Sequence, residues 1–359
     1  MIIITGGHLT PALSLIDELH RRHFTDIVFI GRQISGDEAH LPAQEARLIT
    51  AKGIQFIPLT TGKLYRHFSL KAIISLLKIP LGLFKSWLTL RQLKPQLVVS
   101  FGGYLALPVC IAAKVLAIPI ITHEQGTRVG LANRLIGLMA RKIAISWPVN
   151  RLAFPIKKTV LTGNPLRSAI LDHRTKSLIP GPINRPLLYV TGGNQGSRII
   201  NQTLLSLLPT LTQRYLIIHQ TGLGDFAQFN RLQLPYYFPF AWLEDTQVAW
   251  CLFHAALVIS RSGANTVTEL AFTGTPAILI PLPRAQQNEQ WHNANLLNAA
   301  GTAQVILQTE LTPTRLEQEI NFVLSHLDQF KRHGRAARKL INPRATRILT
   351  DLIYGLLKN

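Results

Sequence analysis

Short apolar runs rich in β-branched residues alternate along the chain with longer segments of helical periodicity. These runs predict strands at residues 2–4, 27–30, 97–100, 118–121, 143–146, 159–161, 187–191, 216–219, 257–260, 277–280 and 304–307. Strands that alternate with helices form parallel sheets. The pattern therefore predicts an α/β fold of doubly wound parallel sheets.

One supersecondary unit, a strand followed by a glycine turn and a helix, occurs twice. It begins at Thr5-Gly6-Gly7-His8 and again, about half a chain later, at Thr191-Gly192-Gly193-Asn194. The repeat predicts two Rossmann-like domains that face each other across a cleft. Turn residues at 163–165 give 1–164 to the first domain and 165–343 to the second, and we expect the amphipathic segment 344–359 to pack back on the first.

Composition excludes several classes of protein. With 359 residues and 47% hydrophobic content, the chain can form packed cores and is not disordered. Cys110 and Cys251 are too far apart for a disulfide framework or a cysteine-built metal site. The N-terminal apolar run is too short for a signal peptide, and the stretch 97–113 falls short of the roughly 20 residues that a spanning helix needs. These features predict a cytoplasmic protein without a transmembrane segment.

Positive charge is concentrated in the first half. The chain has 38 Lys and Arg against 18 Asp and Glu, and Glu124 is the only acid between Glu45 and Asp172. Such an imbalance favours a polyanionic partner. No zinc-finger spacing, RNP signature or arginine run is present, so we expect no nucleic acid.

Residues 71–91 interleave lysines with large apolar side chains. This composition suits an anionic membrane surface, with Lys78 and Lys85 near phosphates and Phe84 and Trp87 in the headgroup layer. The alternative is a pair of core helices, interrupted at residues 80–82, with solvated lysines.

Glycine turns after strands suit phosphate, because free backbone N–H groups and the helix dipole point at the ligand. Besides the two turns above, Gly102-Gly103-Tyr104 follows the strand at 97–100. Tight packing of the backbone is enough to explain a single glycine turn after a strand. It explains three such turns less well, which favours phosphate binding. Neither the P-loop spacing nor the full dinucleotide fingerprint is present.

Further polar groups follow predicted strands. Glu269 lies on a helix that begins after 260–263, where an acid often bonds paired ribose hydroxyls, although an exposed helix carboxylate is the alternative. His123-Glu124-Gln125-Gly126 follows the strand at 118–121, and Glu124 lines the crevice or pairs with an arginine. His8 can act as a base near neutral pH, or it is incidental. No carboxylate pair has metal-ligand spacing, so we expect no resident metal.

Together these residues resemble the MurG family, N-acetylglucosaminyltransferases of the cytoplasmic membrane face that convert lipid I to lipid II in peptidoglycan synthesis. The motifs that carry the resemblance are Gly6-Gly7-His8 with Pro11-Ala12-Leu13, Gly102-Gly103-Tyr104, His123-Glu124-Gln125 with Gly130–Asn133, Gly163-Asn164-Pro165-Leu166-Arg167, Gly192–Ser197, Arg261-Ser262-Gly263-Ala264 with Glu269, and Gln290 with Asn293-Ala294. Their order and spacing over most of the chain make the match specific.

The resemblance implies a GT-B fold and an inverting transfer by direct attack, with UDP-GlcNAc on the second domain and lipid I on the first. It implies catalytic roles for His8 and Glu124. The implied acceptor residues are Gly6, Gly7, His8, Gly102, Gly103, Tyr104 and His123. The implied donor residues are Gly126, Arg167, Asn194, Gln195, Gly196, Leu243, Ala264, Asn265, Glu269, Glu289 and Gln290. No cofactor is implied beyond a divalent cation that could accompany the diphosphate.

This chain departs from the family pattern in both halves. Its first glycine loop is shorter than the usual Gly-Gly-Thr-Gly-Gly-His, and Gly126, Asn194 and Glu289 stand where the family commonly has Asn, Ser and His or Gln. Three alternatives therefore stay open: a relative with another lipid acceptor, an enzyme like the UDP-GlcNAc epimerases, and a UDP-sugar-binding protein without turnover.

Overall fold

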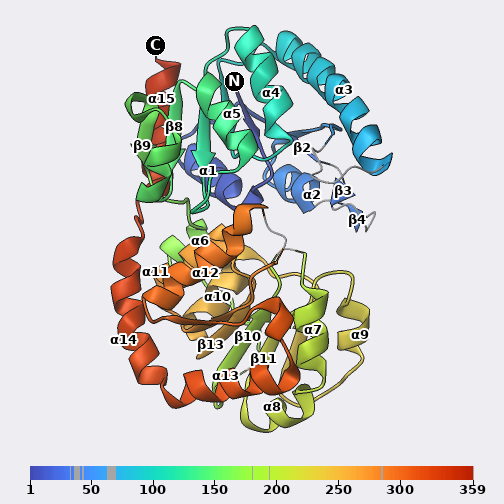
Figure 1. Cartoon of the computed structure of the whole chain (residues 1–359), viewed down its shortest axis with the longest axis vertical. Helices are drawn as coiled ribbons and strands as arrows, with labels where there is room; N and C mark the ends of the chain where they lie inside the picture. The colour runs from blue at the N-terminus through green and yellow to red at the C-terminus, as the bar shows by residue number, and fades with distance from the viewer. Residues whose placement is uncertain are drawn as a thin grey trace. The chain divides into compact units, whose positions relative to one another are not determined.

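The computed structural model describes the chain except for residues 33, 36–40, 43, 63–69, 180, 194, 284–285 and 359. The chain divides into two compact units, and Figure 1 traces it from blue to red. Unit 1 contains Met1–Pro165 and Arg344–Asn359, and unit 2 contains Leu166–Pro343. Both ends of the chain therefore belong to unit 1.

The described strands of unit 1 form a seven-stranded parallel sheet in the order β5-β2-β1-β6-β7-β8-β9. The chain order reverses at β1, which pairs with β2 on one side and with β6 on the other. In open α/β sheets, ligands bind where the strand order reverses, beyond the carboxyl ends of the strands. The strands are β1 (Ile2–Thr5), β2 (Ile27–Gly31), β5 (Gln55–Pro58), β6 (Leu97–Ser100), β7 (Ile120–Glu124), β8 (Lys142–Ile145) and β9 (Thr159–Leu161), with a separate antiparallel pair β3 (Ile34–Ser35) and β4 (Leu41–Pro42).

Helices cover both faces of this sheet, because alternate strand residues point to opposite sides. Ile2 and Ile4 lie in a core cluster with residues of α1, α2 and α15, whereas Ile3 lies in a second cluster with residues of α3, α4 and α5. The helices are α1 (Leu9–Arg21), α2 (Gln44–Thr50), α3 (Leu70–Leu93), α4 (Ala106–Val115), α5 (Leu131–Met139) and α15 (Ala345–Leu357), and the 3-10 turns η1 (Pro148–Ala153) and η2 (Ile156–Lys158) join β8 to β9.

The described strands of unit 2 form a six-stranded parallel sheet in the order β12-β11-β10-β13-β14-β15. Its order reverses at β10, which pairs with β11 and β13. The strands are β10 (Leu187–Thr191), β11 (Leu216–Gln220), β12 (Tyr237–Phe240), β13 (Leu257–Ser260), β14 (Ala277–Leu279) and β15 (Ala303–Val305). The helices are α6 (Ser168–Leu171), α7 (Arg198–Leu205), α8 (Leu208–Arg214), α9 (Phe226–Asn230), α10 (Asp245–His254), α11 (Ala264–Thr273), α12 (Glu289–Ala299), α13 (Pro313–Ser325) and α14 (Leu327–Ala337), with 3-10 turns η3 (Gln286–Asn288), η4 (Gln308–Glu310) and η5 (Arg338–Leu340).

Local signals set the ends of several helices. Thr312 caps α13 by accepting a hydrogen bond from the backbone N–H of Arg315, and Pro313 occupies the first turn. Glu244 and Gln247 form a capping box at the start of α10. The helix α11 ends at Thr273 and is followed by Gly274, whose φ of 73° is a left-handed conformation that glycine adopts without strain.

The predicted α/β fold class is confirmed, but several local predictions need correction. The strand predicted at 118–121 is β7, which begins at Ile120 and continues to Glu124, so His123 and Glu124 belong to the strand. Neither β5 nor β12 was predicted, because both are edge strands with partly exposed residues, and β12 contains Pro239. The helix α3 is continuous through Pro80 and is not a pair of helices.

None of the helices in the described parts of the chain is both long enough and apolar enough to cross a membrane.

Candidate functional site

The two glycine turns of unit 1, Gly6-Gly7 and Gly102-Gly103, contact each other where the strand order reverses. The backbone N–H of Gly7 donates to the carbonyl of Gly102 (3.1 Å), and the N–H of Phe101 donates to the carbonyl of Thr5 (2.7 Å). Gly6 has a φ of +136°, and a Cβ at this position would lie 2.8 Å from the backbone of Phe101. Only glycine permits this approach. The structure thus brings together the predicted acceptor residues Gly6, Gly7, Gly102 and Gly103, followed by the half-buried Tyr104.

His8 is the residue that precedes α1, and its Nδ1 atom lies 3.0 Å from the carbonyl oxygen of Phe101. A carbonyl oxygen only accepts hydrogen bonds, so Nδ1 carries the proton in the neutral ring. The lone pair is then on Nε2, and the ring is half-buried. In this tautomer Nε2 is the ring nitrogen that can accept a proton as a general base.

Two neighbouring side chains lie beneath these turns. Gln125 donates from Nε2 to the same carbonyl of Phe101 (3.1 Å). His123 donates from Nε2 to the carbonyl of Gly163 (3.0 Å) and is fully buried. Burial lowers the pKa of His123 to about 4, so the ring is neutral at neutral pH. The predicted acceptor residue His123 therefore lies inside unit 1.

The carboxylate of Glu124 organises the loop after β7. Its Oε2 accepts from Nδ2 of Asn133 (2.8 Å), and its Oε1 accepts from the backbone N–H of Gly126 (3.1 Å). The side chain is only 5% exposed. Gly126, predicted to bind the donor, is held further by Asn150, whose Nδ2 donates to its carbonyl (3.0 Å). These contacts show how Glu124 and Gly126 are positioned.

In unit 2, Glu269 takes part in a buried charge cluster. Arg167 donates from Nε to Oε1 of Glu269 (2.7 Å) and from Nη1 to Oδ1 of Asp245. Burial raises the pKa of Glu269, and Arg167 offsets this only in part. Burial alone lowers the pKa of Arg167, but the two carboxylates raise it above its ordinary value. Asp245 was not predicted, because an acid at the start of a helix is common for helix stability alone.

The glycine turn of unit 2, which begins at Gly192-Gly193, joins β10 to α7. Gly196 has a φ of +77°, and a Cβ there would lie 2.1 Å from the carbonyl oxygen of Thr221. Its N–H donates to the carbonyl of Gly193 (3.1 Å), which closes the turn next to the exposed Gln195. The predicted donor residue Asn194 lies outside the described residues.

The start of α12 is tied to the loop before α11. Oε1 of Gln290 accepts from the backbone N–H of Leu282 (3.0 Å), so its amide N–H groups are directed elsewhere. Ser262 donates from Oγ to the carbonyl of Gln290 (2.7 Å). Asn293 links Ser262 to Glu289 by donating from Nδ2 to the carbonyl of Ser262 (3.3 Å) and to Oε1 of Glu289 (3.4 Å).

Other predicted donor residues lie at helix starts in unit 2. Ala264 is the first residue of α11 and is buried, and Asn265 follows it half-buried. Leu243 is 1% exposed and precedes the capping residue Glu244 of α10. Their backbone groups, rather than charged side chains, are what these positions offer a ligand.

The predicted membrane residues lie on α3. Lys78, Lys85 and Phe84 are exposed, whereas Trp87 is half-buried and packs against the core of unit 1. The Phe84 and Trp87 rings stack with their centroids 6.1 Å apart. Further exposed apolar side chains on this helix are Leu76, Leu77, Leu81 and Leu88.

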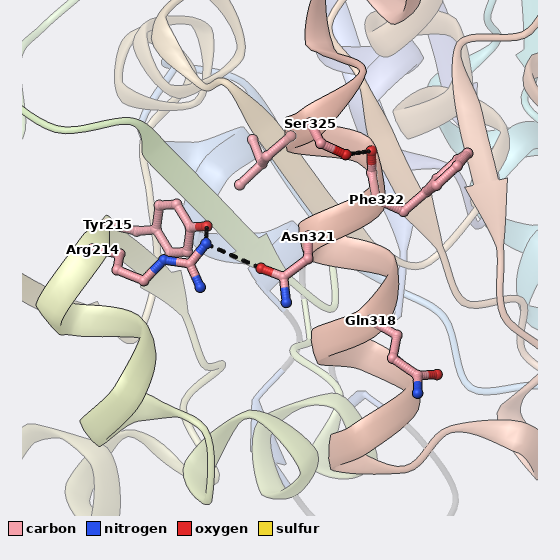
Figure 2. Close-up of a pocket in the computed structure, with 7 residues that line it drawn as sticks. Arg214, Tyr215, Gln318, Asn321, Phe322 and Ser325 are labelled. Carbon is pink, nitrogen blue, oxygen red and sulfur yellow. Dashed lines mark hydrogen bonds between the residues drawn. The ribbon is translucent and has the colours of Figure 1, made fainter.

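Figure 2 shows a surface hollow of unit 2 that was not predicted, lined by Arg214, Tyr215, Gln318, Asn321, Phe322, Leu324 and Ser325. Arg214 donates to Oδ1 of Asn321 (3.2 Å). Arg214 and Tyr215 precede β11, so the hollow is at the amino edge of the sheet. The candidate donor residues of unit 2 follow the carboxyl ends of its strands, at the opposite edge of the sheet. The hollow is therefore not part of the candidate donor site. Across the described residues, no group of three or more His, Cys, Asp or Glu side chains could hold a metal ion.

Comparisons with known proteins agree with this architecture. Two protein-family models match the chain. The Glycosyltransferase family 28 N-terminal domain matches residues 1–145, and the Glycosyltransferase family 28 C-terminal domain matches residues 187–346. Fold and matches together define a glycosyltransferase with the GT-B fold.

Related proteins show which glycosyltransferase family the chain belongs to. A protein of Treponema denticola is 30% identical over 97% of this chain and 95% of its own, and one of Nitratidesulfovibrio vulgaris is 32% identical over 98% and 95%. Both are named UDP-N-acetylglucosamine--N-acetylmuramyl-(pentapeptide) pyrophosphoryl-undecaprenol N-acetylglucosamine transferase. The crystal structure of Acinetobacter baumannii MurG matches with a TM-score of 0.67 and 25% identity over 99% of both chains. The chain belongs to this transferase family, the MurG family.

Proposed function

We propose that this chain transfers N-acetylglucosamine from UDP-GlcNAc to the muramoyl sugar of lipid I, forming lipid II for peptidoglycan. The observation that carries the proposal is the match to transferases of that name over 97–98% of the chain. The positions of His8 and Glu269 support it, since one is oriented as a base and the other can accept hydrogen bonds from ribose hydroxyls.

On the donor side, the proposal assigns roles to Glu269, Gln290 and two backbone segments of unit 2. Glu269 accepts hydrogen bonds from the ribose hydroxyls, and the N–H groups of Gln290 donate to the sugar. Backbone N–H groups at Gln195 and at the start of α11 bind the diphosphate, because helix N-termini favour anions. No cofactor is required, and a divalent cation could accompany the diphosphate.

On the acceptor side, the glycine turns at Gly6-Gly7 and Gly102-Gly103 bind the diphosphate of the lipid. Nε2 of His8 takes the proton from the attacking hydroxyl while its oxygen bonds to the anomeric carbon of the donor sugar. The bond from that carbon to the UDP oxygen breaks, and UDP leaves with the electron pair. Attack opposite the leaving group inverts the anomeric centre.

A peripheral position at the cytoplasmic face of the membrane follows from the same proposal, since the acceptor is lipid-linked. Leu77 and Phe84 are 73% and 59% exposed on α3, beside the exposed Lys78 and Lys85. Exposed apolar side chains among lysines suit a surface of anionic lipids. The net charge of +20 favours the same partner.

The test is UDP release from UDP-GlcNAc, measured with and without a short-chain lipid I analogue, with UDP-glucose as the donor control. We expect release only when UDP-GlcNAc and the lipid are both present. UDP release without lipid, together with isomerised sugar, would instead indicate an epimerase. UDP-GlcNAc binding without turnover on the lipid would refute the proposed acceptor.

A further inference from the structure

Arg167 lies between two carboxylates that come from different helices. It precedes α6, and its Nε and Nη1 atoms donate to Glu269 in α11 and to Asp245 at the start of α10. The side chains of Arg167 and Glu269 are 12% and 6% exposed, whereas that of Asp245 is 34% exposed. Two separate donor atoms therefore anchor the guanidinium plane at both of its ends.

The charge of this cluster does not suit a diphosphate. One guanidinium and two carboxylates leave a net negative charge, and Nε and Nη1 of Arg167 are already engaged. A ribose is different, because its hydroxyls are neutral donors. No described residue donates to Oε2 of Glu269, so that oxygen can accept from a hydroxyl.

The contact to Asp245 determines how Arg167 can approach Glu269. A guanidinium released from Asp245 can turn and pair with both oxygens of Glu269, since side-by-side pairing is the preferred geometry of arginine and carboxylate. Both oxygens would then be occupied. With Nη1 held by Asp245, only Oε1 of Glu269 is engaged.

We propose that Asp245 is a positioning residue for the donor nucleotide, which holds Arg167 so that Glu269 keeps an oxygen available for the ribose 2′- and 3′-hydroxyls. This inference rests on the proposed function and deepens it, because it assigns ribose selectivity to Asp245. Asp245 is the first residue of α10 and directly follows the capping residue Glu244.

The experiment compares the affinities of the full chain for UDP and for 2′-deoxy-UDP by calorimetry. The unaltered chain is expected to prefer UDP by about tenfold or more, as for a hydrogen bond to a charged group. In Asp245→Ser the side chain is too short to reach Arg167, and α10 keeps its capping residue Glu244. We expect this variant to lose about tenfold in UDP affinity and to bind both nucleotides almost equally. Asp245→Asn keeps an acceptor oxygen and is expected to retain part of the preference.

Glu244→Ala is the matched control, because it removes a contact at the same helix start without touching Arg167. It is expected to lower the melting temperature but to keep the preference for UDP. An unchanged preference in Asp245→Ser, or an equal loss of affinity for both nucleotides, would overturn the inference. If the unaltered chain bound no UDP, the proposed function itself would fail. That outcome differs from the two results that would overturn only the role of Asp245.

Discussion

The carbonyl oxygen of Phe101 accepts hydrogen bonds from two side chains, His8 and Gln125 (3.0 and 3.1 Å). This contact joins residues 93 positions apart and assigns the proton of His8 to Nδ1. A sequence can place a histidine at a glycine turn, but it cannot say which ring nitrogen keeps its lone pair. At the scale of single residues, the candidate chemistry thus depends on backbone groups from distant strands.

If Nε2 of His8 is the base, His8→Ala lowers kcat by about 10²- to 10⁴-fold, the usual contribution of a positioned base. The KM for UDP-GlcNAc should change little, because the His8 contact belongs to unit 1. Steady-state UDP release measures both constants. His20→Ala, on the same helix, is the control and should behave as the unaltered chain. Full turnover in His8→Ala would remove His8 as the base.

A second residue-scale prediction concerns acid stability. Burial lowers the pKa of His219 to about 3, and its ring nitrogens bond the Tyr237 hydroxyl (2.8 Å) and Oδ1 of Asn201 (2.9 Å). The unfolded chain therefore binds a proton below pH 6.5 that the folded chain does not. Stability from this group is complete above about pH 6.5 and is lost as the pH falls toward about 3.

Between pH 6.5 and pH 5, His219 should cost unit 2 about 2 kcal/mol of unfolding free energy, at 1.36 kcal/mol for each pH unit. Urea unfolding at both pH values measures this difference. His219→Gln should be less stable at pH 7 but should show a smaller change with pH. The same pH dependence in both proteins would contradict this assignment.

At the scale of elements, the sequence pattern of α3 was compatible with two different structures. Its lysines and apolar residues fit either a membrane surface or solvated core helices, and the helix in the structure has both characters. Ser86 and Leu90 are buried in unit 1, while Leu77 and Phe84 are exposed. Trp87 faces the core cluster, so a substitution there would test packing as much as membrane contact.

We therefore predict that Lys78→Gln with Lys85→Gln weakens binding to phosphatidylglycerol vesicles about tenfold or more, at about 1 kcal/mol for each lysine. Phe84→Ser should weaken it further, and the remaining binding should depend less on salt. Vesicle sedimentation measures the affinity. Lys331→Gln with Arg332→Gln removes the same charge from α14 of unit 2 and should have a smaller effect. Equal effects of the two charge changes would indicate that net charge alone drives binding.

At the scale of the whole molecule, unit 1 is built from both ends of the chain. The helix α15 packs against α1, and its residues Leu349 and Ile353 are fully buried in the core cluster that contains Ile2 and Ile4. The first half of the chain thus lacks part of its own core until the last residues are in place.

Leu349→Ala should therefore destabilise unit 1 by about 2–5 kcal/mol, the usual cost of a large-to-small core substitution. UDP binding, which is assigned to unit 2, should persist. Urea unfolding with and without UDP separates the two effects. Asp351→Asn removes only an exposed ion pair with Arg22 and should change stability by less than about 1 kcal/mol. Loss of UDP affinity in folded Leu349→Ala would show that the units are coupled.

The sequence by itself determined the fold class, most of the strands and the types of polar group that follow them. These features are local: β-branched runs form strands, glycines permit turns, and charge follows from composition. Edge strands with mixed patterns, such as β5 and β12, were not predictable in this way.

Only the tertiary structure decided which groups meet. It paired Arg167 with Asp245 and Glu269, 78 and 102 positions away, and it closed the core of unit 1 with α15. Such contacts depend on the packing of whole helices and on burial, which makes an unpaired charge costly. A local pattern of residues contains no information about which distant partner satisfies that requirement.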